Sequence, residues 1–197
     1  YPQFDYVVVT DGPTDGTDRL CAYRGYNTVN LPQNMGLAMC FHNGMQYAAR
    51  MDYKYAVQFD GDGQHRPEYI EAMKKKADEG YDIVMGSRFI GLENDMSPMR
   101  SLGSYIIKTA ILLKTGARVT DPTCGLRLYD RKLIRLFAER TDLAPEPDTV
   151  ARLIRHGARA AEVPVKVSER ENGESYLRPM KAAKYMYRMI TAILFEK

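Results

Sequence analysis

Residues Tyr55 to His65, YAVQFDGDGQH, join a short apolar run to a polar turn that carries two carboxylates. The run over residues 55–60 predicts a buried β-strand, and the glycines and aspartates after it are typical of a turn. Two aspartates separated by one glycine can face the same divalent cation, and their hard oxygen atoms suit Mg²⁺ or Mn²⁺. We therefore predict a metal site at Asp60 and Asp62, with an acidic turn that binds nothing as the alternative.

Apolar runs and helical patterns alternate in both directions from this stretch. Further strands are predicted over residues 4–10, 28–31, 82–86, 124–129 and 160–167. Helices are predicted over residues 17–24, 36–51, 67–79, 98–115, 131–140, 146–156 and 179–195. This order predicts one α/β domain over residues 1–197, in which helices cover both faces of a mostly parallel sheet. Because ligands of such sheets bind beyond the carboxyl ends of the strands, the turns after residues 10, 60 and 86 should lie at the same edge.

The segment Asp11 to Thr17, DGPTDGT, predicts a turn that leads into a helix, with Asp15 or Thr17 as the N-cap. Asp11 is able to accept a hydrogen bond from a base or a ribose. The spacing alone favours a turn without a ligand.

The composition is that of an ordinary globular protein, with 45% hydrophobic and 27% charged residues. A net charge of +3 gives no support to a nucleic-acid partner. The basic C-terminal third suits phosphate groups or an anionic membrane surface, or it is a solvated helix face. Three widely spaced cysteines indicate neither a disulfide framework nor a zinc site. No run reaches about 18 apolar residues, and no signal peptide is expected. We predict a cytoplasmic domain, with peripheral contact at the inner face of a membrane as an option.

Seven segments, in order along nearly the whole chain, resemble motifs of the family 2 glycosyltransferases. They are residues 11–17 (DGPTDGT), 34–38 (NMGLA), 59–65 (FDGDGQH), 86–88 (GSR), 121–127 (DPTCGLR), 162–165 (EVPV) and 170–175 (RENGES). The most similar branch is that of dolichyl-phosphate mannose and undecaprenyl-phosphate sugar synthases. Any one motif is weak, whereas the ordered set is specific. The chain departs from the family at Thr10, Pro13 and Leu126, where Asp, Ser and Phe are usual, and the first two departures bear on nucleotide affinity.

The resemblance implies a GT-A fold, which is a Rossmann-like three-layer α/β/α sandwich. It also implies a βα unit of roughly 30 residues before residue 1, with a P-x-Y-N-E segment, so the chain is expected to be N-terminally truncated.

The resemblance further implies roles for individual residues. The metal ligands would be Asp60, Asp62 and Gln64. The nucleotide-binding residues would be Asp11, Gly12, Asp15, Asp60, Gly61, Asp62, Arg88, Arg131 and Ser175. Arg127, Arg131 and Arg170 would lie near phosphate groups, with Arg170 and Ser175 on a mobile loop that closes over the donor. Metal and guanidinium groups would stabilise the departing diphosphate.

Glu146 and Asp148 lie where transferases with sugar acceptors carry a catalytic base, and either could deprotonate a hydroxyl acceptor. The alternative, slightly favoured, is that these acids belong to the first turn of a helix. A lipid phosphate is already ionised and requires no base.

We therefore predict a metal-dependent inverting glycosyltransferase of cell envelope biogenesis. It would move a sugar from a nucleotide-diphosphate sugar to a polyprenyl phosphate or a glycan. A sugar-phosphate nucleotidyltransferase and a non-catalytic nucleotide-sugar-binding module are the alternatives. The apolar stripes of helices 98–115 and 179–195 predict core packing, with docking on a membrane as the alternative.

Overall fold

The computed structural model describes residues 1–91, 98–167 and 179–195. These residues divide into two compact units, and each is described by itself. The first unit comprises Tyr1–Ala56 and Arg131–Pro145, and the second comprises Val57–Asp130 and Glu146–Lys197. That the whole chain forms one catalytic domain stays a prediction.

The first unit contains a parallel pair of strands, β1 (Val8–Asp11) and β2 (Thr28–Leu31), and the short helix α1 (Thr17–Tyr23) between them. The pairing places Val8 opposite Thr28 and Asp11 opposite Leu31. β1 is shorter than the predicted strand over residues 4–10. The reason is that a strand is only as long as its ladder, and β2 offers four residues for pairing.

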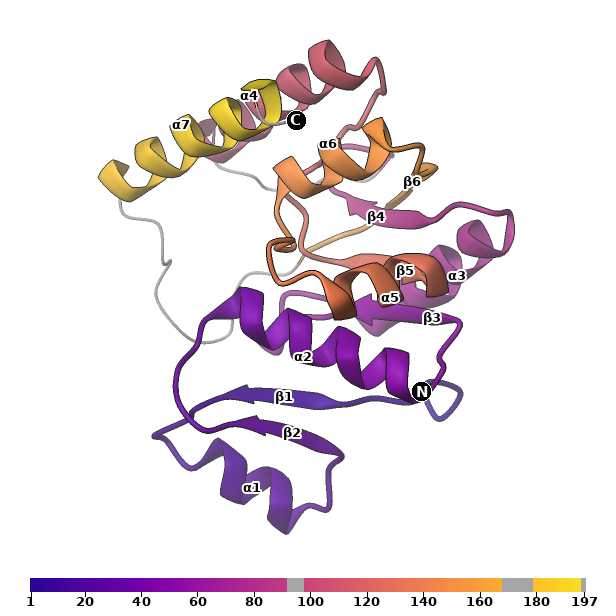
Figure 1. Cartoon of the computed structure of the whole chain (residues 1–197), viewed down its shortest axis with the longest axis vertical. Helices are drawn as coiled ribbons and strands as arrows, with labels where there is room; N and C mark the ends of the chain where they lie inside the picture. Colours follow the sequence, from indigo (N-terminus) through magenta and orange to yellow (C-terminus); the bar gives the residue numbers. More distant parts are fainter. Residues whose placement is uncertain (92–97, 168–178, 196–197) are drawn as a thin grey trace. The chain divides into compact units, whose positions relative to one another are not determined.

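Two helices complete the first unit, α2 (Leu37–Arg50) and α5 (Arg131–Glu139), and they lie side by side (Figure 1). The rings of Phe41 and Phe137 meet edge to face with centroids 4.9 Å apart. His42 is buried, and its Nδ1 lies 2.8 Å from the carbonyl oxygen of Phe137. The apolar face of α2 is thus covered by a helix that is distant from it in the sequence.

The second unit is built on a four-stranded sheet with the order β3-β5-β4-β6. Its strands are β3 (Tyr55–Gln58), β4 (Ile83–Ser87), β5 (Arg127–Asp130) and β6 (Ala160–Pro164). The boundary between the two units falls within β3, after Ala56. β4 runs parallel to β6 and antiparallel to β5. One mostly parallel sheet was predicted, whereas the described residues form two sheets and include an antiparallel pair. β5 is reversed because the chain comes back to the carboxyl end of β4, where Gly86 N–H donates to the carbonyl of Leu126.

The second unit also contains helical elements. They are the 3₁₀ turn η1 (Pro67–Tyr69), α3 (Ile70–Asp78), α4 (Pro98–Thr115), α6 (Pro147–Arg155) and α7 (Pro179–Phe195). α7 lies beside both α4 and α6 (Figure 1). Every residue of β4 is buried, since β4 pairs with β5 on one edge and β6 on the other and α3 packs against it. Among the helices that the structure describes, none combines the length and the apolarity needed to cross a bilayer.

Candidate active site

The turn directly after β3 holds the two aspartates in a fixed local arrangement. The backbone N–H of Asp60 donates to Nδ1 of His65 at 3.0 Å, and the N–H of Gln64 donates to Oδ1 of Asp62 at 3.1 Å. His65 is buried, and its ring meets Phe59 edge to face at 5.6 Å. The Asp60 side chain is 40% exposed. The buried imidazole of His65 therefore holds the backbone of the turn, while the Asp60 carboxylate stays exposed to solvent.

The charges near His65 show which predicted residues lie together. Burial lowers the pKa of His65, the carboxylates of Asp60 and Asp62 act in the opposite direction, and the guanidinium of Arg88 lowers the pKa further. All three charged side chains therefore lie within electrostatic range of one ring. Two predicted metal ligands, Asp60 and Asp62, and the predicted nucleotide-binding residue Arg88 therefore lie near the same imidazole in the second unit.

Gly125 belongs to a loop over residues 120–125 that closely approaches the aspartate turn. A Cβ atom at Gly125 would lie 3.0 Å from Oδ2 of Asp60 and 3.3 Å from Cε1 of His65. A side chain there would require one of these two groups to shift by a few tenths of an ångström. The backbone at Gly125 therefore packs closely against the aspartate turn.

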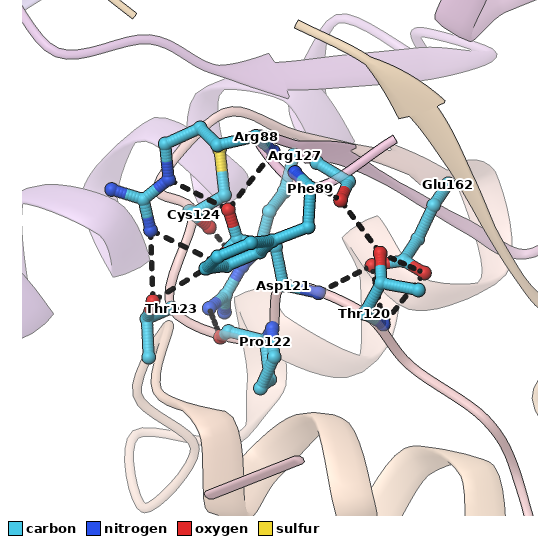
Figure 2. A network of polar contacts seen from close by, with 10 residues as sticks. Arg88, Phe89, Thr120, Asp121, Pro122, Thr123, Cys124, Arg127 and Glu162 are labelled. Atoms are coloured by element: carbon cyan, nitrogen blue, oxygen red, sulfur yellow. Dashed lines mark hydrogen bonds and ion pairs between the residues drawn. The ribbon is translucent and has the colours of Figure 1, made fainter. Parts of the chain in front are cut away.

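Arg88, directly after β4, is held by the same loop (Figure 2). Its Nε and Nη2 donate to the two oxygens of Asp121 at 2.6 and 2.8 Å, and its backbone N–H donates to Oδ2 at 3.1 Å. Nη2 also donates to the hydroxyl of Thr123 at 2.8 Å. Burial raises the pKa of Asp121, but the hydrogen bonds and charge of Arg88 outweigh it and hold that pKa below its ordinary value. The orientation of the guanidinium is therefore fixed before any ligand binds.

Arg127, the first residue of β5, is only 2% exposed. Its Nε donates to the carbonyl of Cys124 at 3.0 Å, and its Nη2 donates to the carbonyl of Pro122 at 2.8 Å (Figure 2). These bonds hold the loop 120–125 from its other end. Contact between Arg127 and a phosphate stays a prediction.

Two acidic residues lie at the start of α6. Glu146 occupies the N-cap position, and its Oε2 accepts a hydrogen bond from the hydroxyl of Tyr185 on α7 at 2.5 Å. Oδ1 of Asp148 is buried without a hydrogen-bond partner among the described residues. Burial and the charge of Glu146 raise the pKa of Tyr185, while Arg127 acts in the opposite direction. The predicted acids therefore share one region with Arg127, and their role as a base stays a prediction.

Asp11 of the first unit binds the backbone just before α2. Its carboxylate accepts the backbone N–H groups of Met35 at 2.6 Å and Gly36 at 2.9 Å. Gly12 has a φ of 57°, and a Cβ there would lie 2.3 Å from the backbone carbon of Gln33. These contacts fold the turn after β1 onto the residues before α2.

The other predicted residues of the first unit make local contacts. Oδ1 of Asp15 accepts the N–H and the hydroxyl of Thr17, at 3.0 and 2.7 Å. The N-cap of α1 is nevertheless Gly16, without a side-chain cap, so the prediction of Asp15 or Thr17 as the N-cap is wrong, because the chain enters the helix through the left-handed conformation that glycine adopts. Arg131 binds the end of α2, with Nη2 2.9 Å from the carbonyl of Asp52 and Nη1 3.2 Å from its carboxylate. Roles of Asp11, Asp15 and Arg131 toward a nucleotide stay predictions.

The remaining predicted site residues are Gly61, Arg170 and Ser175. Gly61 is exposed, and a Cβ there would meet nothing within 4 Å. Arg170 and Ser175 lie in residues 168–178, outside the part of the chain that the structure describes.

Sequence reasoning placed Asp121 and Glu162 only within motifs and gave them no function. The structure shows Asp121 fully buried within the loop 120–125, where it accepts from Arg88, and shows Glu162 accepting from the N–H of Asp121. A signal was present at Glu162, because a carboxylate within the apolar stretch 160–167 has to find buried donors.

A family model described as glycosyl transferase family 2 matches residues 1–137, well over half of the chain. The chain belongs to glycosyl transferase family 2. The predictions of a glycosyltransferase and of this family are thereby confirmed.

Relatives of this family 2 domain are named for polyprenyl-phosphate chemistry. The chain is 27% identical over 204 residues to the polyprenol monophosphomannose synthase of Mycolicibacterium smegmatis. The aligned region covers 95% of this chain and 76% of that protein. The chain is also 30% identical over 201 residues to an undecaprenyl-phosphate 4-deoxy-4-formamido-L-arabinose transferase of Klebsiella pneumoniae, covering 97% of this chain. The chain spans 58% of the length of that second relative. The predicted resemblance to the polyprenyl-phosphate branch is confirmed.

Solved structures show the same fold. A crystal structure of glucosyl-3-phosphoglycerate synthase from Mycobacterium tuberculosis with phosphoglyceric acid matches with a TM-score of 0.66 and 17% identity, covering 95% of this chain and 67% of that one. A second structure of that enzyme, in complex with Mn²⁺, uridine diphosphate and phosphoglyceric acid, matches with a TM-score of 0.63 and 16% identity, over 95% of this chain and 65% of that one. The predicted α/β GT-A fold is confirmed.

Proposed function

We propose that this domain transfers a sugar from a nucleotide-diphosphate sugar to a polyprenyl phosphate, with inversion at the anomeric carbon, in the synthesis of the cell envelope. The observation that carries the proposal is the turn after β3, where His65 fixes the backbone of Asp60 while the Asp60 carboxylate stays open. The names of the two relatives support the acceptor.

The residues of the turn fit a divalent cation that is shared with a substrate. Among the described residues, no group of three or more His, Cys, Asp or Glu side chains is placed to hold a metal ion. Mg²⁺ and Mn²⁺ commonly bind through one or two carboxylates and complete their coordination with phosphates and water. Asp60 and Asp62 would hold such an ion, with Gln64 as a further ligand. The bound ion would supply charge stabilisation to the diphosphate that leaves.

The chain itself supplies oriented cationic donors beside this turn. The guanidinium of Arg88 is held by Asp121 and Thr123, so its orientation does not have to be established when the donor binds. Arg127 acts on the site indirectly, because it donates hydrogen bonds to carbonyl groups of the loop that carries Asp121. We assign it a positioning role. Asp11, Asp15 and Arg131 are assigned to the nucleotide, and Arg170 and Ser175 to closure over the donor.

The contacts of Glu146, the N-cap of α6, favour an ionised acceptor over a glycan hydroxyl. Glu146 accepts a hydrogen bond from Tyr185 and lies 3.8 Å from Arg188, so its oxygens are engaged within the protein. A phosphate monoester carries its own negative charge and attacks the anomeric carbon without a base. Attack from the face opposite to the departing diphosphate inverts that carbon in one displacement.

Peripheral contact with a membrane is part of the proposal, because a polyprenyl phosphate resides in one. One side of α4 is buried through Ser104, Ile107 and Ile111. The other side exposes apolar residues at helical spacing, namely Leu102, Tyr105, Ile106, Leu112 and Leu113. Lys108 lies among them, 5.1 Å from the ring centre of Tyr105. An apolar stripe with a cation suits the surface of an anionic bilayer.

Transfer assays with labelled nucleotide sugars and a short polyprenyl phosphate in detergent test the proposal. We expect transfer from one donor, loss of transfer with EDTA and recovery with Mn²⁺ or Mg²⁺. Asp60→Asn and Asp62→Asn should each lower kcat/KM by about a hundredfold or more. Asp78→Asn, which removes an exposed ion pair with Lys74 on α3, is the matched control and should change nothing.

Other outcomes point to the other functions. Formation of a nucleotide sugar from a sugar phosphate and a nucleoside triphosphate would show a nucleotidyltransferase. Metal-dependent binding of a nucleotide diphosphate, measured by calorimetry, without turnover of any donor would show a binding module. Retention of configuration in the product, measured by NMR, would contradict the single displacement.

A further inference from the structure

Glu162 of β6 binds the start of the loop 120–125 (Figure 2). The N–H of Thr120 lies 3.0 and 2.8 Å from its two oxygens, and the Thr120 hydroxyl donates to Oε2 at 2.9 Å. The N–H of Asp121 donates to Oε1 at 2.8 Å. Both backbone donors at the entrance of the loop are therefore satisfied by one carboxylate.

The hydrogen bonds that continue from Thr120 have a fixed direction. An ionised carboxylate only accepts, so the Thr120 hydroxyl must donate to Glu162. Its oxygen then accepts from the hydroxyl of Ser87, which is 2.6 Å away. The oxygen of Ser87 in turn accepts the N–H of Phe89 at 3.2 Å. Two residues that flank Arg88 are thus tied to Glu162 through Thr120.

Arg88 itself is tied to Glu162 by a second route. Its guanidinium and its backbone N–H bind the carboxylate of Asp121, whose own N–H is held by Glu162. The backbone and the side chain of Arg88 therefore both take their position from residues that Glu162 fixes.

We propose that Glu162 is a positioning residue for the donor site, which sets the orientation of Arg88 through Thr120 and Asp121. This inference rests on the proposed function, in which Arg88 lines the donor pocket. Glu162 is assigned no direct contact with a substrate. Its effect reaches the donor through Arg88.

The test is a double-mutant cycle between Glu162→Gln and Arg88→Ala, read as the KM for the donor. The glutamine keeps the size of the side chain but presents an NH₂ donor to backbone donors. We expect Glu162→Gln to raise the donor KM by about tenfold, the effect of losing a hydrogen bond to a charged group. In the Arg88→Ala background the same change should alter KM by less than about twofold, because its route to the donor is gone.

A structural role alone would give a different pattern. Equal KM changes in both backgrounds, or no change in either, would overturn the inference. Thr120→Val, which removes one of the two routes, should give a smaller KM increase and serves if Glu162→Gln does not fold. Asp82→Asn is the matched control, since Asp82 accepts the N–H of Arg159 at 2.6 Å before the opposite end of β4. It should lower the melting temperature and leave KM unchanged.

Failure of the proposed function is distinguishable from failure of this inference. Wild-type protein that transfers no sugar overturns the proposed function and the inference with it. If the wild-type protein transfers sugar but Glu162→Gln changes the donor KM equally with and without Arg88, only the inference is overturned.

Discussion

Asp121 is fully buried yet ionised, and Arg88 makes this burial tolerable. A buried carboxylate without a partner would take up a proton, because burial disfavours its charged form. The guanidinium of Arg88 offers a planar fork that matches the two oxygens, which an ammonium group does not. The pair therefore places a fixed guanidinium next to the aspartate turn.

Asp121→Asn should destabilise the protein by about 3 kcal/mol at neutral pH, because it leaves the charge of Arg88 without its partner. The folded-state pKa of Asp121 lies below the ordinary value of 3.8. The stabilisation is therefore fully present above that value and is lost as the pH falls through the lower folded-state pKa. Urea unfolding of both proteins between pH 7 and pH 2.5 measures the difference, which should shrink below pH 3.8.

Asp142→Asn is the control for this comparison, because its ion pair with Arg140 is exposed. It should change the free energy of unfolding by less than about 1 kcal/mol. A difference between wild type and Asp121→Asn that stays constant with pH would contradict the role of the Arg88 pair.

At the scale of elements, turns fix how strands and helices follow one another. The turn after β1 contacts the residues that precede α2, because Gly12 leaves no side chain in between. Asp11 then accepts the N–H groups of Met35 and Gly36. The register of β1 against β2 and the start of α2 are thus linked through one turn.

Gly12→Ala should destabilise the first unit by more than about 2 kcal/mol. The added Cβ would collide with the backbone of Gln33 at 2.3 Å, and the residue would also keep a left-handed φ. Gly25→Ala provides the match, because Gly25 has a φ of 66° but nothing within 4 Å of its Cβ. That variant should lose only about 1 kcal/mol, the cost of the conformation. Equal losses in urea unfolding would show that the close approach does not matter.

At the scale of the whole molecule, the proposed acceptor and the surface of α4 point to the same environment. The chain carries a net charge of +3, and the exposed stripe of α4 includes Leu113, which is 75% exposed. Attraction to anionic lipid and burial of the stripe would act together, and salt would weaken the first.

Leu113→Glu should therefore lower binding to vesicles that contain anionic lipid by about tenfold, by removing apolar area and adding repulsion. Cosedimentation with such vesicles measures it, at low and at high salt. Leu20→Glu, on the exposed side of α1, introduces the same charge and should have little effect. Equal losses for both variants would show attraction by net charge and would exclude a docking role for α4.

Local patterns predicted much of the architecture. The bounds of α4 and α7 agree with the prediction, and β2 does as well, because apolar periodicity and turn residues act over a few neighbours. The turn at Asp60 and Asp62 was also predicted, since its residues are close neighbours in the sequence.

The sequence by itself determined the order of the elements, the aspartate turn and the family. Only the tertiary structure decided that β5 runs antiparallel to β4, that Arg127 is buried, and that Glu162 and Arg88 meet Asp121. The physical reason is separation along the chain, which is 41 residues from Asp121 to Glu162 and 33 to Arg88. Which buried carboxylate receives which donor depends on where distant segments pack, and no local pattern contains that information.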